Sequence, residues 1–318
     1  MRDTTKEILD KYQVRKSKKQ KTAFIDYIKG VCRGAGYEAR VERGSFGARN
    51  IVVGNPTTAK VVYTAHYDTC PVLPMPNFIT PKNFFIYLLY QLLLTAVIML
   101  LPMAILILVV DYFLTFAGVD PSYHSEIIYA SELLFMLFIM WLIMFGPANK
   151  HTANDNTSGV TTLVNIIEDL PFQMRDQVAF IFFDLEEVGL VGSSSYAKTH
   201  KHVMKNKLLI NFDCVSDGNN MLLVLGKGAR AYKKLIENAY VPTDDLNVLI
   251  ESKGVFYPSD QAVFKCGVGV ASLKATRRGM LYMDRIHTPR DTVYEERNVE
   301  YLKESSIKLV KQLCETDK

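Results

Sequence analysis

Two adjacent glutamates, Glu186 and Glu187, stand just past an apolar run that ends at Asp184-Leu185 and whose residue types favour a buried β-strand. Neighbouring side chains on a strand point to opposite faces, so the two carboxylates are not interchangeable. Two negative charges at this spacing repel each other unless a cation lies nearby. A solvated loop at a strand end is the commoner explanation of such a pair. A cation site is the alternative, and it requires further ligands elsewhere in the sequence.

Other acidic and imidazole side chains occupy comparable positions. His66 and Asp68 end the run KVVYTAHYD, and Asp213 ends KLLINFD. Asp155 lies in the polar turn HTANDNTSG, and His287 lies in the segment RIHTPRDT. A single strand-end histidine or aspartate is usually just hydrogen-bonded, but ligands converge at the carboxyl ends of strands in open α/β sheets. Two histidines, two aspartates and a glutamate are sufficient for two zinc ions that share a bridging carboxylate.

In this order, the motifs HYD, NDNTSG, EEVGLVGS, NFD and IHTPRDT resemble those of the co-catalytic zinc aminopeptidases, the family of bacterial leucyl aminopeptidases and of the glutamate carboxypeptidase type (peptidase clan MH). The resemblance covers residues 20–70 and 150–315. It implies two zinc ions as cofactors, or other divalent metals such as cobalt or manganese. The implied ligands are His66 and Asp213 for one ion, Glu187 and His287 for the other, and Asp155 as the bridge between them.

Two further residues receive roles from the same resemblance. Asp68 would orient His66 from behind the metal, and Glu186 would be the general base. The family commonly has a cis peptide bond after the bridging aspartate, which here is the bond Asp155–Asn156. The implied reaction removes the amino-terminal residue of a peptide by means of a metal-activated water, whose proton Glu186 passes to the leaving amine.

Two other functions are compatible with these motifs. Glutaminyl-cyclase-like aminoacyltransferases share the HYD and FDxEE elements, and a receptor or scaffold without activity could use the same fold. The complete NDNTSG element favours hydrolysis, and no ligand position is lost.

Cys70 and Cys214 adjoin motif residues, but we expect them to be packing residues. Residues 259–261, SDQ, resemble a family SDH element with glutamine in third place, and four histidines match no motif: His124, His151, His200 and His202.

Alternating apolar runs predict an α/β fold in which helices cover both faces of a mixed central sheet. We expect strands at 37–42, 50–54, 60–66, 177–184, 207–212, 221–225, 246–251 and 268–273. We expect helices at 21–34, 157–170, 190–200, 228–240, 259–265 and 298–314.

One segment departs from this pattern because it contains no Lys or Arg between Lys82 and Lys150. Residues 83–110 carry no charge, and residues 127–145 carry a single acidic group. Helices of these lengths could cross a hydrocarbon core of about 30 Å, and Pro102 is a site for a bend. We therefore predict a transmembrane hairpin of two helices. A pair of soluble core helices or a dimer interface is the alternative.

The predicted organisation is a catalytic domain in two parts, 1–82 and 146–318, with the transmembrane hairpin inserted at 83–145. Segment 111–126, which connects the two apolar runs, has acidic residues but no Lys or Arg, whereas lysines flank the outer ends. The positive-inside rule therefore places the catalytic domain on the cytoplasmic side of the cell membrane. The basic run RKSKKQK at 15–21 suits either anionic lipid or, more commonly, a solvated helix face.

Composition excludes several other classes of protein. The five cysteines are scattered without a CxxC pair, so we expect neither a disulfide framework nor a zinc ribbon, and a reducing compartment agrees with this. A net charge of +4 with 22% charged residues does not indicate a nucleic-acid partner or a disordered chain. The charged amino-terminal segment lacks the apolar core of a signal peptide. The expected partners are a peptide substrate and the lipid bilayer, and the oligomeric state stays open.

Overall fold

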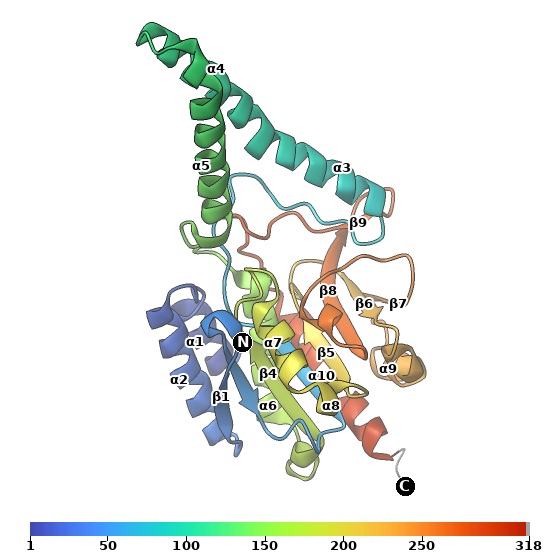
Figure 1. The fold of residues 1–318 in the computed structure, drawn as a ribbon. Coiled ribbons are helices and arrows are strands. Elements are labelled where there is room, and N and C mark those ends of the chain that lie inside the picture. The colour runs from blue at the N-terminus through green and yellow to red at the C-terminus, as the bar shows by residue number, and fades with distance from the viewer. Residues whose placement is uncertain (316–318) are drawn as a thin grey trace.

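Within residues 1–315, which are the residues that the computed structural model describes, nine strands form one mixed sheet (Figure 1). The strands are β1 (Ala39–Arg43), β2 (Arg49–Val53), β3 (Val61–His66), β4 (Val178–Phe183), β5 (Leu208–Phe212), β6 (Asn220–Leu225), β7 (Asn247–Glu251), β8 (Gly267–Ala275) and β9 (Leu281–Tyr282). Their order is β1-β2-β4-β3-β5-β8-β6-β7, and β9 pairs with β8. The sheet is mixed because β3, β4, β5 and β8 are parallel, whereas β2 and β6 run antiparallel to β4 and β8. The predicted fold class is confirmed; positions 316–318 of the expected second part lie outside the described residues.

Helices cover both faces of this sheet, as predicted (Figure 1). They are α1 (Asp3–Lys11), α2 (Lys18–Gly34), α6 (Gly159–Asp169), α7 (Val191–Thr199), α8 (Lys201–Met204), α9 (Lys233–Ala239) and α10 (Glu296–Glu315). Alternate residues of β4 join different cores. Phe180 and Phe182 pack in a core with α2, α6, α9 and α10, whereas Ile181 and Phe183 pack in a second core with α7 and α8. Burial on both faces is typical of the central strands of an α/β sheet.

The parallel strands β3, β4 and β5 end at the same edge of the sheet. His66 at the end of β3 is in register with Phe183 at the end of β4, and Thr64 of β3 is in register with Asn211 of β5. The chain therefore leaves all three strands at one place. The segments that follow carry Asp68, Glu186, Glu187 and Asp213.

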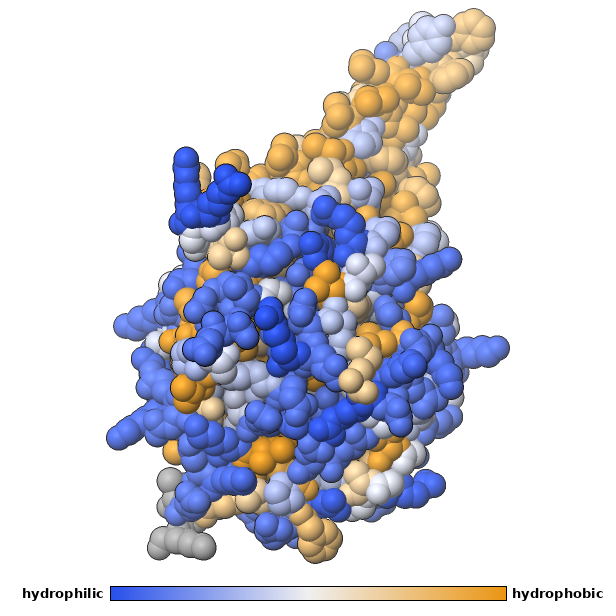
Figure 2. Space-filling view, turned by 180° about the vertical axis from the view of Figure 1, so that it is seen from behind, coloured by the Kyte–Doolittle hydropathy of each residue, from blue (hydrophilic) through white to orange (hydrophobic). Residues whose placement is uncertain are grey.

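Two long apolar helices project from the rest of the molecule (Figures 1 and 2). The first, Phe84–Phe116, consists of α3 (Phe84–Thr95), a π-helical segment (Ala96–Leu100) and α4 (Leu101–Phe116), and the second, Pro121–Phe145, contains α5 (His124–Phe145). No residue of α3, of the π-helical segment, of α4 or of α5 is buried. They are therefore not core helices of this chain. The π-helical segment directly precedes Pro102, where the sequence predicts a bend and where the missing N–H disturbs the helical hydrogen bonds.

The connection between these two helices is shorter than the sequence suggests. Of the expected connecting segment 111–126, only residues 117–120 lie outside helical structure, because α4 continues to Phe116 and a 3-10 turn begins the second helix. Asp111 does not end the helix because its side chain is exposed and lies 3.0 Å from Nδ1 of His124 on the other helix.

One expected helix is absent within the described residues. Segment 259–265 forms only a 3-10 turn, Asp260–Val263. Buried side-chain contacts determine its shape: Nδ2 of Asn211 donates to Oγ of Ser259 at 3.0 Å and to Oε1 of Gln261 at 3.1 Å. These bonds hold the turn against β5. The sequence pattern that predicts a helix here contains no information about such contacts with a distant strand.

The basic run at 15–21 is not a solvated helix face throughout its length. Arg15 is fully buried, and its Nε donates to the carbonyl of Tyr67 at 2.5 Å. Lys21 forms a buried ion pair with Asp184. Only the middle of the run is exposed. Both ends of the run are therefore buried by contacts within the protein, although its composition is typical of an exposed segment.

Candidate metal centre

The carboxylate of Asp155 lies between two imidazole rings. Its Oδ1 is 3.3 Å from Nε2 of His66, and its Oδ2 is 2.9 Å from Nε2 of His287. His66 ends β3, Asp155 lies in the π-helical turn before α6, and His287 lies in the loop between β9 and α10. Three segments that are distant in the sequence thus meet around one carboxylate.

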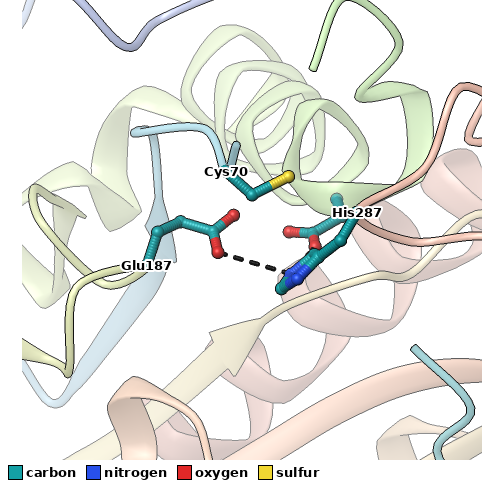
Figure 3. Close-up of side chains that lie close together, drawn as sticks. Cys70, Glu187 and His287 are labelled. Atoms are coloured by element: carbon teal, nitrogen blue, oxygen red, sulfur yellow. Dashed lines mark ion pairs between the residues drawn. The ribbon is translucent and has the colours of Figure 1, made fainter. Parts of the chain in front are cut away.

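Two sets of potential ligands share Asp155. Oδ1 of Asp213 is 3.4 Å from Nε2 of His66, and Oε2 of Glu187 is 3.3 Å from Nε2 of His287 (Figure 3). The sets are His66, Asp155 and Asp213, and Cys70, Asp155, Glu187 and His287, and in each the ligand atoms lie within 4.8 Å of one another. The structure therefore brings together all five implied ligands, grouped as the resemblance pairs them.

Cys70, which the sequence analysis predicts to be a packing residue, is also a member of the second set. It is buried, as a packing residue would be, but its side chain also faces Glu187 and His287 (Figure 3). Burial, and then the charges of Glu187 and Asp155, raise the pKa of its thiol well above the usual value. Its place two residues after Asp68 was the available signal.

Asp68 contacts two of the candidate ligands, His66 and Glu187, and also Glu186. Its two carboxylate oxygens accept hydrogen bonds from the backbone N–H groups of Glu186 at 3.0 Å and of Glu187 at 3.3 Å. Its backbone carbonyl is 3.1 Å from Nδ1 of His66, and its Oδ1 is 3.6 Å from the same atom. These contacts point Nε2 of His66 toward Asp155 and hold both glutamates at the strand end.

Asn156 anchors the turn that carries Asp155. The peptide bond Asp155–Asn156 is cis, as the resemblance implies. The side chain of Asn156 donates to the carbonyl of Phe212 at 2.9 Å and accepts from the N–H of Gly159 at 3.0 Å. The turn is thereby attached to the end of β5 and to the start of α6.

Asp291 holds the same turn from the other side, and sequence reasoning missed it. Its carboxylate accepts from the N–H groups of Asn154 at 2.8 Å and of Asp155 at 2.9 Å. Burial, and then the charge of Asp155, raise its pKa to about 7. Asp291 belongs to the motif IHTPRDT, in which only His287 has an expected role.

The site concentrates negative charge in a buried space. Burial, and then Asp155, raise the pKa of Glu187 to about 8. Burial also raises the pKa of Glu186 well above its usual value and that of Asp260, in the SDQ segment, to about 7. Burial lowers the pKa of His287, but Glu187 and Asp155 outweigh it and raise that pKa to about 9. The site therefore contains more buried carboxylates than positively charged side chains that could pair with them.

A divalent cation fits this environment. Imidazole nitrogens and carboxylate oxygens are common ligands of zinc. Oε1 of Glu187 is buried and has no hydrogen-bond partner, so it is available as a ligand atom. A bound cation would also offset the repulsion among the carboxylates.

Arg15 is a buried cation beside the site that the sequence does not reveal. Burial lowers its pKa to about 10, and the charges of Asp68 and Asp155 oppose that change. Its Nη1 donates to Oγ1 of Thr157, which follows Asp155 by two residues, at 3.1 Å. An arginine in a basic run before a helix resembles a surface residue, so composition and spacing contain no signal of this role.

The remaining histidines lie outside both ligand sets. His124 contacts Asp111 in the hairpin, and Nε2 of His200 is 2.7 Å from Oε2 of Glu42. His151 and His202 belong to none of the ligand groups found within residues 1–315.

A pocket of about 390 Å³ adjoins the ligands. Asp68 and Glu187 form part of its wall, and Met144 and Phe145 at the end of α5 form another part. A second pocket of about 390 Å³ lies between the hairpin helices and is lined by none of the candidate ligands. Residues at the sheet edge and residues of the hairpin thus both line the pocket beside the ligands.

A comparison with protein families finds a match to the model of peptidase family M28 over residues 142–306, more than half of the chain. The chain belongs to peptidase family M28. It is a metallopeptidase of the co-catalytic zinc aminopeptidase type, which agrees with the order of its motifs and with the imidazole and carboxylate groups at the sheet edge.

Solved structures share the fold of this peptidase. The LapA aminopeptidase of Legionella pneumophila has a TM-score of 0.53 at 12% identity, over 98% of this chain and 70% of that one. The glutaminyl cyclase of Porphyromonas gingivalis has a TM-score of 0.55 at 15% identity, over 98% and 97% of the chains. That of Bacteroides thetaiotaomicron has a TM-score of 0.54 at 14% identity, over 96% and 94%. None of the curated proteins compared with it matches its sequence.

We expect zinc to stabilise this peptidase after treatment with a chelator. A ligand that binds only the folded state raises the free energy of unfolding by about 2.7 kcal/mol when its concentration is about 100 times its Kd. The measurement is the Tm of the chelator-treated protein with and without zinc. Asp155→Asn should abolish the rise, because Asp155 belongs to both ligand sets.

Asp169→Asn is the matched control, because Asp169 forms an ion pair with Arg2 outside the ligand sets. This variant should retain the zinc-dependent rise in Tm. An equal rise in the Asp155 and Asp169 variants would contradict a metal centre at Asp155.

Proposed function

We propose that the protein is a zinc-dependent aminopeptidase that is anchored in the membrane by its hairpin and removes amino-terminal residues from peptides. The observation that carries the proposal is the position of Asp155, whose two oxygens face different histidines. Zinc supplies Lewis acidity at such a site, because it polarises a carbonyl group and lowers the pKa of water. In the proposed assignment His66 and Asp213 would hold one ion, Glu187 and His287 would hold a second, and Asp155 would serve as a ligand of both.

Glu186 is the proposed general base. A carboxylate oxygen of Glu186 lies within 4.8 Å of ligand atoms of His66 and Glu187, and its backbone N–H is bound by Asp68. It therefore adjoins the proposed ligands without belonging to either set that shares Asp155. Its carboxylate takes a proton from the attacking water and returns it to the nitrogen of the departing amine.

The hairpin is the proposed membrane anchor. Apolar side chains cover its surface (Figure 2), and its spans of 33 and 25 residues exceed the roughly 20 residues that a helix needs to cross a bilayer. The tip of the hairpin contains acidic residues but no Lys or Arg. In the proposed topology this tip lies outside the cell and the peptidase domain lies in the cytoplasm.

Substitution of the two adjacent glutamates should separate their roles. Glu186→Gln should lower hydrolysis of aminoacyl-arylamides by at least about 10²–10⁴-fold and leave the metal content unchanged, because the residue moves a proton and binds no ion. Glu187→Gln should instead deplete bound zinc. Elemental analysis of the purified proteins, with rates on the same samples, gives both quantities. Loss of metal from the Glu186 variant would overturn this division of roles.

The same assay tests cyclisation, the activity named for two of the similar structures. With glutaminyl-arylamide as substrate, an aminopeptidase releases free glutamine and the arylamine, whereas a cyclase releases ammonia and leaves the cyclised residue attached to the arylamine. Mass spectrometry of the product distinguishes them. Cyclised product from glutamine, with no hydrolysis of leucyl-arylamide, would replace the proposed function.

The membrane topology predicts opposite labelling at the two ends of the hairpin. In a variant without native cysteines, Ala117→Cys at the tip should react with an impermeant thiol reagent added to intact cells. Lys150→Cys should react only after permeabilisation, because it lies on the cytoplasmic side. Both side chains are exposed, so burial does not explain a difference. The reverse pattern would refute the orientation, and equal labelling would refute the membrane span.

A further inference from the structure

The two ligand sets that share Asp155 differ in number and in chemistry. The first has three members, a histidine and two aspartates. The second has four members, whose ligand atoms lie within 4.8 Å of one another: Cys70, Asp155, Glu187 and His287. Figure 3 shows the side chains of Cys70, Glu187 and His287 converging on one space. A sulfur atom therefore belongs to only one of the two sets.

The carboxylate of Glu187 offers a free ligand atom in the same space. This side chain is only 6% exposed, and its Oε2 is 3.3 Å from Nε2 of His287. Its Oε1 is buried and has no hydrogen-bond partner within residues 1–315. A buried polar atom normally has a partner. A cation between this oxygen, the imidazole and the sulfur of Cys70 would supply one.

Backbone hydrogen bonds join the segment that carries Cys70 to both of the other ligand segments. Three residues after Cys70, the N–H of Leu73 donates to the carbonyl of His287 at 2.8 Å. Two residues before Cys70, the carboxylate of Asp68 accepts from the N–H of Glu187 at 3.3 Å. The sulfur therefore has a fixed position relative to the carboxylate and to the imidazole.

Sulfur changes the coordination chemistry of the set that contains it. Thiolate sulfur, imidazole nitrogen and carboxylate oxygen all bind zinc, usually as four tetrahedral ligands. A thiol that coordinates zinc gives up its proton to the solvent, because the cation stabilises the thiolate. A zinc site with four protein ligands is closed, whereas a site with three leaves a position for water or a substrate. Thiolate also favours zinc over manganese, which prefers oxygen ligands.

We propose that the sulfur of Cys70 is the fourth protein ligand of the zinc ion in the second set and closes its coordination shell. The ion of the first set, with three protein ligands, then retains the position for water or a substrate. The inference rests on the zinc centre of the proposed function and goes beyond it, because the motifs imply no sulfur ligand. The second set is thereby selective for zinc.

X-ray absorption at the zinc edge tests this ligand in the full-length protein, in detergent and without thiol reductants. With both sets filled, the wild type should show a Zn–S distance of about 2.3 Å beside Zn–N and Zn–O distances of about 2.0–2.2 Å. The sulfur count should be about half an atom per zinc, since one ion of each pair has it. Cys70→Ser should lose the sulfur signal and keep the nitrogen and oxygen signals.

Cys214→Ser is the matched control. Cys214 is also buried, and its Sγ lies 3.2 Å from Oδ1 of the proposed ligand Asp213, but it belongs to none of the ligand groups within residues 1–315. This variant should keep the Zn–S signal. Absence of zinc-bound sulfur in the wild type, or its persistence in Cys70→Ser, would overturn the proposal.

Competition between zinc and manganese tests the selectivity. In chelator-treated protein, Cys70→Ser should weaken the binding of one zinc ion by at least about ten-fold, because even residues that only orient a ligand change metal affinity roughly 10–100-fold. The affinity for manganese should change much less, because a thiolate suits it poorly. Cys214→Ser should leave both affinities near the wild-type values. Equal weakening of the two metals in Cys70→Ser, or unchanged zinc binding, would contradict a selective thiolate ligand.

The zinc-edge spectrum also separates this inference from the proposed function, because it requires no turnover. A protein that hydrolyses no aminoacyl-arylamide but shows zinc-bound sulfur would refute the aminopeptidase activity and support the ligand. A wild-type spectrum without sulfur, together with full hydrolysis, would refute the role of Cys70 and leave the aminopeptidase activity supported.

Discussion

Buried carboxylates gather at one edge of the sheet and repel one another. β3, β4 and β5 are parallel and end in register, so the acidic segments after them meet at a single place. Asp155 then enters from the turn before α6 and lies within 3.3 Å of two imidazoles. Like charges in a buried environment remain ionised only beside compensating positive charge. The two imidazoles and the guanidinium of Arg15 provide part of it, and a divalent metal would add to it.

Neutral hydrogen-bonding groups, more than ion pairs, give these carboxylates their orientation. Asp68 accepts from two consecutive backbone N–H groups, and Asp291 does the same for the turn around Asp155. Asn156 joins that turn to β5. These hydrogen bonds leave the ligand oxygens directed at the imidazoles. Because hydrogen bonds act only over a short distance, displacement of one strand end would move several ligands together. The site and the sheet edge are therefore one structural unit.

The position of the hairpin in the chain explains its contact with the site. It is inserted between Asp68 and Asp155, and both of these residues contact His66. The segments that enter and leave the hairpin must therefore start and finish beside the ligands, and the bond between Asn149 and Cys70 pairs them there. The last turn of α5 consequently lines the pocket that reaches Glu187. In this chain an insertion at that point becomes part of the wall of the site.

The fold class, the apolar hairpin and the occurrence of histidines and acids at strand ends could be predicted from the sequence. Each of these follows from local signals: periodicity, runs without charge, and ordered motifs. Other features depend on tertiary contacts and could not be predicted. They are the burial of Arg15 and Lys21, the place of Cys70 in the second ligand set, the 3-10 turn at Asp260 and the part of the pocket wall formed by Phe145. Their causes are contacts between segments far apart in the chain, such as Lys21 with Asp184 and Lys16 with Met144. A residue's type reports its own chemistry, but which partner removes it from water depends on how distant segments pack.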